Sequence, residues 1–133
     1  VSASSAIAEY LALHNINTEA VGICNSSCAL IFLGGKTRTL SSDAKLGFHR
    51  TWLDPEAIKK KYVKNRIKEG WDDEFDYAAM LYDSAQTSLL YYINFMLGRG
   101  VDIDFILRIF STDSYDMWVP TREELLSAGV LTK

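Results

Sequence analysis

The feature that most constrains the fold of this chain is a polar segment, residues 24–27, that separates two short apolar runs. Residues 19–23 are partly β-branched and bounded by turn residues, which predicts a buried strand. Residues 28–33 are apolar and end at Gly34 and Gly35, which predicts a buried helix closed by a left-handed cap. The sequence therefore predicts a strand, a tight polar turn and a buried helix in succession.

Further elements are predicted on either side of this unit. Residues 1–14 predict an amphipathic helix with Ile7, Tyr10 and Leu11 on its apolar face. Residues 36–40 predict another strand.

A strand is also predicted over residues 45–49, where side chains alternate between two faces. Leu46 and Phe48 share one face, which we expect to be the buried one. His49 must then point with Gly47 to the opposite face.

Start and stop signals predict four further helices. The start signals are Asp54 with Pro55, Asp72 with Asp73, Asp102, and a capping box of Thr121 with Glu124; the ends are Gly70, Met96, Phe110 and Gly129. The first of these helices has an apolar stripe made of Ile58, Tyr62, Val63 and Ile67.

Composition limits the number of domains and the classes of partner. The 133 residues, 48% of them apolar, can bury one sizeable core, so we expect a single domain over residues 1–133. The formal net charge of -3 gives no general attraction to nucleic acid or to an anionic membrane surface. No apolar run reaches the roughly 18 residues that a membrane span needs. We therefore expect neither a nucleic-acid partner nor a membrane span.

Cys24 and Cys28 are the only cysteines, and they form either a small disulfide loop or two reduced thiols. A fully extended chain would separate their Cα atoms by about 13 Å, so a bridge demands a sharp turn over residues 25–27. A zinc site is the rival interpretation. Two thiols with only His14 and His49 elsewhere make a poor ligand set, so we expect no metal.

Ser26 and His49 are the candidate catalytic pair. A serine in a tight turn between a strand and a helix presents its hydroxyl beside the first N–H groups of that helix. Ser26 or Ser27 could instead simply cap the helix. His49 is the outward residue of a strand 23 positions later (49 minus 26), near enough for the two strands to be neighbours. A nucleophile with its general base is one reading, and a capping serine beside a structural histidine is the other.

The residues around this pair resemble a known family. Residues 22–38, GICNSSCALIFLGGKTR, and residues 44–49, AKLGFH, are similar to the serine-to-histidine stretch of the Clp protease proteolytic subunit. They are more similar still to bacterial periplasmic proteins related to that subunit, which carry a Cys-x-Ser-x-Cys turn. In the family the nucleophile stands in a Ser-x-Gly-Ala context, and Ser26 falls on it with a Cys in place of the Gly. The spacing of eleven between Arg38 and His49 (49 minus 38) also matches, which implies that His49 is the general base.

The resemblance implies an α/β domain of the ClpP/crotonase type, in which repeated β-β-α units pack helices on a mostly parallel sheet. Residues 51–82 would be a helical insertion in that domain. The first residues look like the segment that follows the family's Gly-Gly turn, so that turn, which forms the oxyanion hole, is expected to be missing here. A homo-oligomer and a periplasmic or secreted location are further implications.

The third catalytic residue is less well defined. The family's orienting aspartate comes just before a segment that residues 116–131 resemble, and the matching place is near Thr112. Asp113 and Asp116 are the nearest acids. Each is also a natural loop residue that accepts backbone hydrogen bonds. A Ser-His dyad, or an acid from elsewhere, is the alternative.

These observations predict a serine hydrolase, most simply a peptidase acting on a peptide or protein substrate. The rival is a catalytically inactive module of the same fold that serves assembly or peptide binding. Acyl-CoA chemistry of the crotonase type is a third reading, disfavoured because those enzymes commonly use carboxylates and paired backbone donors. We expect no cofactor, because no phosphate-binding loop is present: Lys36 and Thr37 follow Gly35, but Leu30 stands where the first glycine of such a loop would be.

Overall fold

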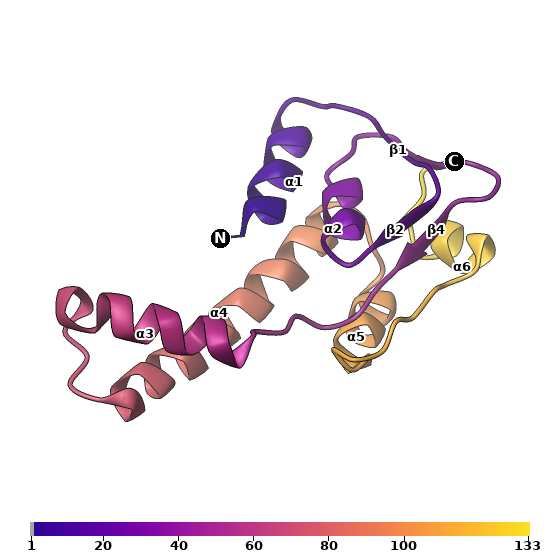
Figure 1. Cartoon of the computed structure of the whole chain (residues 1–133). Helices are drawn as coiled ribbons and strands as arrows, with labels where there is room; N and C mark the ends of the chain where they lie inside the picture. Colours follow the sequence, from indigo (N-terminus) through magenta and orange to yellow (C-terminus); the bar gives the residue numbers. More distant parts are fainter. Residues whose placement is uncertain (1) are drawn as a thin grey trace. The chain divides into compact units, whose positions relative to one another are not determined.

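The computed structural model describes residues 2–133 and contains two pairs of parallel strands (Figure 1). Strand β1 (Thr18–Ala20) pairs with β3 (Arg38–Leu40), and β2 (Ile23–Asn25) pairs with β4 (Lys45–Gly47). Each sheet has two strands. The mixed α/β class and the parallel pairing are therefore confirmed. The two sheets are smaller than the mostly parallel sheet that the resemblance implies.

The strand predicted over residues 19–23 is divided between β1 and β2. Gly22 separates them with a φ of 69°, a left-handed conformation that interrupts an extended strand and that glycine adopts without steric cost. Hydrophobic pattern alone does not locate such a break, because one residue of unusual backbone conformation leaves the pattern intact.

Helix α2 (Ser27–Leu33) confirms the predicted buried helix, but its end differs from the prediction. Gly34 has a φ of -67°, so the left-handed cap is wrong. A Cβ at Gly34 would lie 2.8 Å from the Cα of Ala8, and one at Gly35 would lie 2.9 Å from the Cβ of Thr18. Both glycines therefore serve close packing against α1 and β1, and neither serves a left-handed turn.

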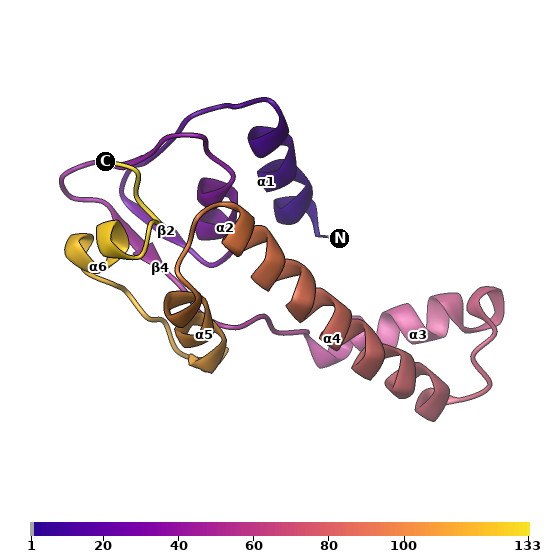
Figure 2. The same cartoon turned by 180° about the vertical axis from the view of Figure 1, so that it is seen from behind.

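Helix α1 (Ala3–Leu13) is also as predicted in position, but it buries a different face. Ser5 and Ala8 are buried, whereas Ile7 and Tyr10 are 47% and 56% exposed. The reason is the close approach of α1 to α2, which lie beside each other in both views (Figure 2). Small side chains fit this contact, and the larger apolar ones are displaced from it.

The four remaining helices are present, and their predicted caps are confirmed; before the second of them, the Asp73 Oδ1 accepts hydrogen bonds from the N–H groups of Phe75 and Asp76. They are α3 (Pro55–Glu69), α4 (Glu74–Gly98), α5 (Ile103–Ser111) and α6 (Arg122–Ser127). Asp54 and Asp102 cap α3 and α5, and Thr121 forms the expected capping box with Glu124. Within residues 2–133, none of the helices combines the length and apolar character needed to cross a membrane.

The chain separates into two compact units. One contains the chain up to Arg50 together with Ile93–Lys133, and the other is Thr51–Tyr92. The candidate site residues all belong to the first unit. The helical insertion that the resemblance implies, residues 51–82, lies within the second.

An aromatic cluster organises the second unit. The ring of Tyr62 stacks on Trp71 and on Tyr77, and the centroids of Trp71 and Tyr77 lie 4.4 Å apart. Val63 and Ile67, which the sequence predicts on the same buried stripe as Tyr62, are 66% and 91% exposed. The predicted stripe of α3 is thus wrong at these two positions, because only the side that carries Tyr62 meets the cluster.

The buried side chain of Arg38 connects β3 to the C-terminal segment of the first unit through hydrogen bonds. The Arg38 side chain donates hydrogen bonds to the carbonyl oxygens of Gly35, Arg99, Gly129 and Val130, at 2.7 to 2.9 Å. Burial, with a smaller contribution from the charge of Arg99, lowers the pKa of Arg38 from its ordinary value. Four carbonyl acceptors compensate this cation, so its role is structural.

We predict that Arg38→Met lowers the free energy of unfolding by about 3 kcal/mol, because it leaves the carbonyl oxygens of Arg99, Gly129 and Val130 without their donor, while that of Gly35 keeps the hydrogen bond from the Arg99 side chain. Urea unfolding at neutral pH measures the loss. Arg122→Met is the matched control, since the exposed Arg122 also donates to two backbone carbonyls. We expect the control to cost less than about 1 kcal/mol. Equal losses in the two variants would contradict the assignment.

Candidate active site

Ser26 lies at the junction between the end of β2 and the start of α2. Its backbone has a φ of 57° and a ψ of -116°, a conformation that non-glycine residues rarely adopt and that costs on the order of 1–3 kcal/mol. The surrounding hydrogen bonds hold it there: Ser26 N donates to the carbonyl of Gly47 at 2.8 Å, and Leu30 N donates to the carbonyl of Ser26 at 3.1 Å.

The hydroxyl of Ser26 is not used as a helix cap. Ser26 occupies the N-cap position of α2, yet its side chain makes no capping hydrogen bond. The residue is exposed, so its oxygen is open to solvent. The alternative that Ser26 is present for capping is therefore not supported by its geometry.

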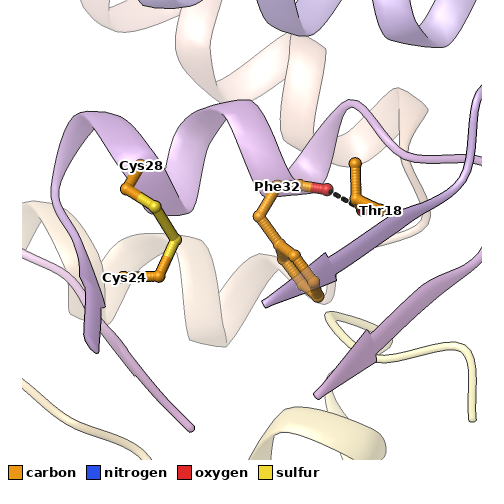
Figure 3. Close-up of a disulfide and its surroundings, with 4 residues drawn as sticks. All are labelled: Thr18, Cys24, Cys28 and Phe32. Carbon is orange, nitrogen blue, oxygen red and sulfur yellow. Dashed lines mark hydrogen bonds between the residues drawn. A yellow bond between two sulfur atoms is a disulfide. The ribbon is translucent and has the colours of Figure 1, made fainter. Parts of the chain in front are cut away.

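The disulfide between Cys24 and Cys28 encloses this turn. It joins β2 to the first turn of α2 with a Cα–Cα distance of 5.1 Å (Figure 3). The bridge confirms the disulfide reading of the two cysteines and removes both thiols from any metal site. At the other end of α2, the Thr18 hydroxyl donates to the carbonyl of Phe32 at 2.8 Å (Figure 3). The helix that follows Ser26 is thus tied to the strands at both ends.

The structure brings His49 to Ser26. The imidazole Nε2 of His49 lies 2.8 Å from the Ser26 Oγ. This contact follows from the parallel pairing of β2 with β4, in which Asn25 is the register partner of Gly47. Leu46 and Phe48 are buried as the strand pattern predicts, so His49 projects from the opposite face. A serine hydroxyl and an imidazole at this distance are the geometry of a nucleophile with its general base.

The backbone beyond β4 is held by the C-terminal part of the first unit. Phe48 and Trp118 form an antiparallel bridge, donating backbone hydrogen bonds to each other at 2.8 and 2.9 Å. Arg50 N donates to the carbonyl of Thr112 at 3.1 Å. The backbone of His49 is therefore held between two attachments.

The two predicted acids lie in the loop after α5 and do not contact His49. Asp113 is exposed and accepts hydrogen bonds from Arg50 at 3.3 Å and from the backbone N–H of Tyr115 at 3.0 Å. The Tyr115 N–H is the main cause that lowers the pKa of Asp113. Asp116 accepts from the backbone N–H of Met117 at 2.8 Å. Of the four predicted site residues, the structure brings only Ser26 and His49 together.

Two polar atoms near this pair have no hydrogen-bond partner among the described residues. They are Nδ1 of His49 and Oδ1 of Asn25, and both are buried. A Cβ added at Gly47 would overlap the Asn25 Oδ1 and would lie 2.8 Å from the Met117 Cγ. Asn25 is not among the residues that the sequence predicts for the site. Nothing in the sequence marks it, because its place over Gly47 depends on the register of β2 against β4.

The site has no evident metal-binding group. Among residues 2–133, no three His, Cys, Asp or Glu side chains are arranged to hold an ion. The groups that the structure places at the site are the serine, the imidazole and the backbone N–H groups at the start of α2.

Comparison of the chain with protein-family models, with curated proteins and with solved structures finds no match.

We predict that reducing the Cys24–Cys28 bridge lowers the free energy of unfolding by about 2 kcal/mol, the loop-closure contribution expected of so short a ring. Urea unfolding with and without a dithiol reductant measures the change. The double variant Cys24→Ala/Cys28→Ala is the control: it should have the lower stability already and show no response to the reductant. A native chain whose stability ignores the reductant would contradict the prediction.

Proposed function

We propose that this chain is part of a serine hydrolase, most simply a peptidase, with Ser26 as the nucleophile and His49 as the general base. The observation that carries the proposal is the 2.8 Å contact between the His49 Nε2 and the Ser26 Oγ. It involves an exposed serine whose hydroxyl is not used to cap its helix. A hydroxyl oxygen becomes a useful nucleophile only with an adjacent base, and the imidazole is in place for that role.

The steps follow from this geometry. The Ser26 Oγ attacks the carbonyl carbon of the substrate while the His49 Nε2 takes its proton, giving a tetrahedral intermediate. Its oxyanion gains from nearby N–H donors, and the start of α2 presents such groups beside Ser26. The imidazolium then returns the proton to the leaving amine as the carbon–nitrogen bond breaks. Water, deprotonated by the same imidazole, hydrolyses the acyl-enzyme and regenerates the serine.

The fold supports this proposal at a coarse level. The resemblance to the Clp proteolytic subunit implies a strand, a serine turn and a helix, followed by a parallel strand that ends near a histidine. The chain has these elements in this order: β2, Ser26, α2, and then β4 before His49. The disulfide supports a periplasmic or secreted location, because such bridges persist in oxidising compartments. We propose both the Clp-like family and this location on these grounds.

A catalytically inactive module that serves assembly or peptide binding is the second candidate. The observation that favours it is the His49 Nδ1, which no carboxylate among the described residues contacts. A base without an orienting partner loses much of its efficiency. The inactive module and the hydrolase make opposite predictions about a covalent probe.

We predict that a fluorophosphonate probe labels the natural protein at Ser26, because the probe reacts with a serine oxygen only where a base activates it. Mass spectrometry of the labelled peptide locates the modification. Ser26→Ala should abolish the label. Ser27→Ala, which removes the neighbouring exposed hydroxyl, should leave it. Absence of any label, or equal labelling of the two variants, would favour the inactive module.

A further inference from the structure

The Cys24–Cys28 bridge and the candidate nucleophile belong to the same ring, residues 24–28. Ser26 is the middle residue of this ring. Its φ of 57° is held by the bridge and by two backbone hydrogen bonds, one to the Gly47 carbonyl and one from Leu30 N. Of these three attachments, the bridge is the one that a redox reaction opens, so the conformation of the serine depends on the redox state of the two cysteines.

The bridge is accessible to a reductant at one of its two cysteines. Cys28 is exposed, as are Ser26 and Ser27 before it, whereas Cys24 is buried. The bridge lies at the first turn of α2, where the ring meets the helix (Figure 3). A reducing thiolate therefore attacks the Cys28 Sγ, because thiol–disulfide exchange requires access to the sulfur that is attacked. Exposed disulfides are the ones that reductants open most readily.

A dithiol, either a protein or a small molecule, balances this exchange. Its first thiolate forms a bond to the Cys28 Sγ as the bond between the two cysteines breaks, and the Cys24 thiolate that leaves takes up a proton. The second thiolate of the reductant then attacks its own sulfur in the mixed disulfide and releases Cys28, which also takes up a proton. The chain gains two electrons and two protons, and the dithiol is oxidised to a disulfide.

Opening the ring changes the position of the serine more than that of the imidazole. Reduction removes the constraint that keeps the Cα atoms of residues 24 and 28 at 5.1 Å. A positive φ at a residue other than glycine persists only where the surroundings enforce it, so Ser26 gains access to conformations of negative φ. Those conformations redirect its side chain away from the His49 Nε2. His49 follows β4, which carries neither cysteine.

We propose that the Cys24–Cys28 disulfide is a redox switch of this site: the oxidised ring holds the Ser26 hydroxyl against His49, and reduction by a dithiol releases it. The effect on catalysis rests on the proposed hydrolase function. The change in the turn does not. Such a switch confines an active serine to oxidising surroundings, where disulfides persist.

The first test follows the turn itself and needs no activity. The Ser26 N–H donates to the Gly47 carbonyl, and the Thr18 N–H, in β1 and outside the ring, donates to the Thr37 carbonyl. We expect reduction to accelerate hydrogen exchange of the Ser26 N–H about tenfold more than that of Thr18, as measured by NMR. Equal acceleration of the two, or none at Ser26 when mass spectrometry shows both thiols free, would overturn the proposal.

The second test compares the rates of fluorophosphonate labelling at Ser26 in the oxidised and the reduced chain, after the dithiol has been removed without exposure to air. We expect labelling to slow about tenfold on reduction and to recover on reoxidation. The variant Cys24→Ala/Cys28→Ala should label at the slow rate in both conditions. Equal rates in the oxidised and reduced native chain would rule out the switch.

Thr18→Val is the matched control for a general loss of stability. It removes the hydrogen bond from the Thr18 hydroxyl to the Phe32 carbonyl at the far end of α2 and leaves the ring intact. We expect this variant to label at the native rate and to slow on reduction as the native chain does. Labelling as slow as that of the reduced native chain would contradict the proposal, because loosening α2 anywhere would then suffice.

The two tests separate the switch from the proposed activity. A chain that takes no label in either redox state, but whose Ser26 N–H responds to reduction as expected, would refute the hydrolase and support the redox-sensitive turn. A chain that labels equally in both states would support the hydrolase and refute the switch.

Discussion

The turn between β2 and α2 is the constraint on which the rest of the site depends. Ser26 adopts a backbone conformation of positive φ that residues other than glycine rarely take. Three attachments hold it: the Cys24–Cys28 bridge, the hydrogen bond to the Gly47 carbonyl, and the first hydrogen bond of α2. The hydrogen bond from the Ser26 N–H to the Gly47 carbonyl also holds the end of β4 beside the turn. Because His49 follows β4, the same bond helps to place the imidazole near Ser26.

A second constraint on the site is that Gly47 has no side chain. Gly47 leaves room for the Asn25 side chain. The register of β2 against β4 then determines the position of His49 along the strands relative to Ser26. The parallel pairing of β2 with β4 therefore helps to set the distance between the Ser26 hydroxyl and the His49 imidazole. A residue with any side chain at this position would compete with Asn25 and Met117 for the same space.

The local chemistry of the sequence predicts much of this arrangement. The helix after Ser26 follows from an apolar run, but β2 extends into the predicted polar turn as far as Asn25, and the predicted burial is wrong at Ile23, which is 78% exposed. The alternation of Leu46 and Phe48 correctly predicts the face from which His49 projects. Helix caps such as Asp54 and Asp102 are equally local, and they are confirmed.

What the sequence cannot predict is set by contacts between distant segments. The buried face of α1 depends on how closely α2 approaches Ala8, and that distance appears in no periodic pattern. The partners of Asp113 and the carbonyls that surround Arg38 are likewise brought together only by the fold. The position of Asn25 escapes prediction for the same reason, since its side chain lies over Gly47 only once β2 and β4 are in register.

The Cys24–Cys28 bridge also bears on the order in which the chain folds. A ring of so few residues closes through local motion, whereas Ser26 and His49 must meet across 23 positions of chain. Oxidation can therefore bend this loop while β4 is still unpaired. Once the bridge has closed, β4 has only to dock onto a turn that is already formed.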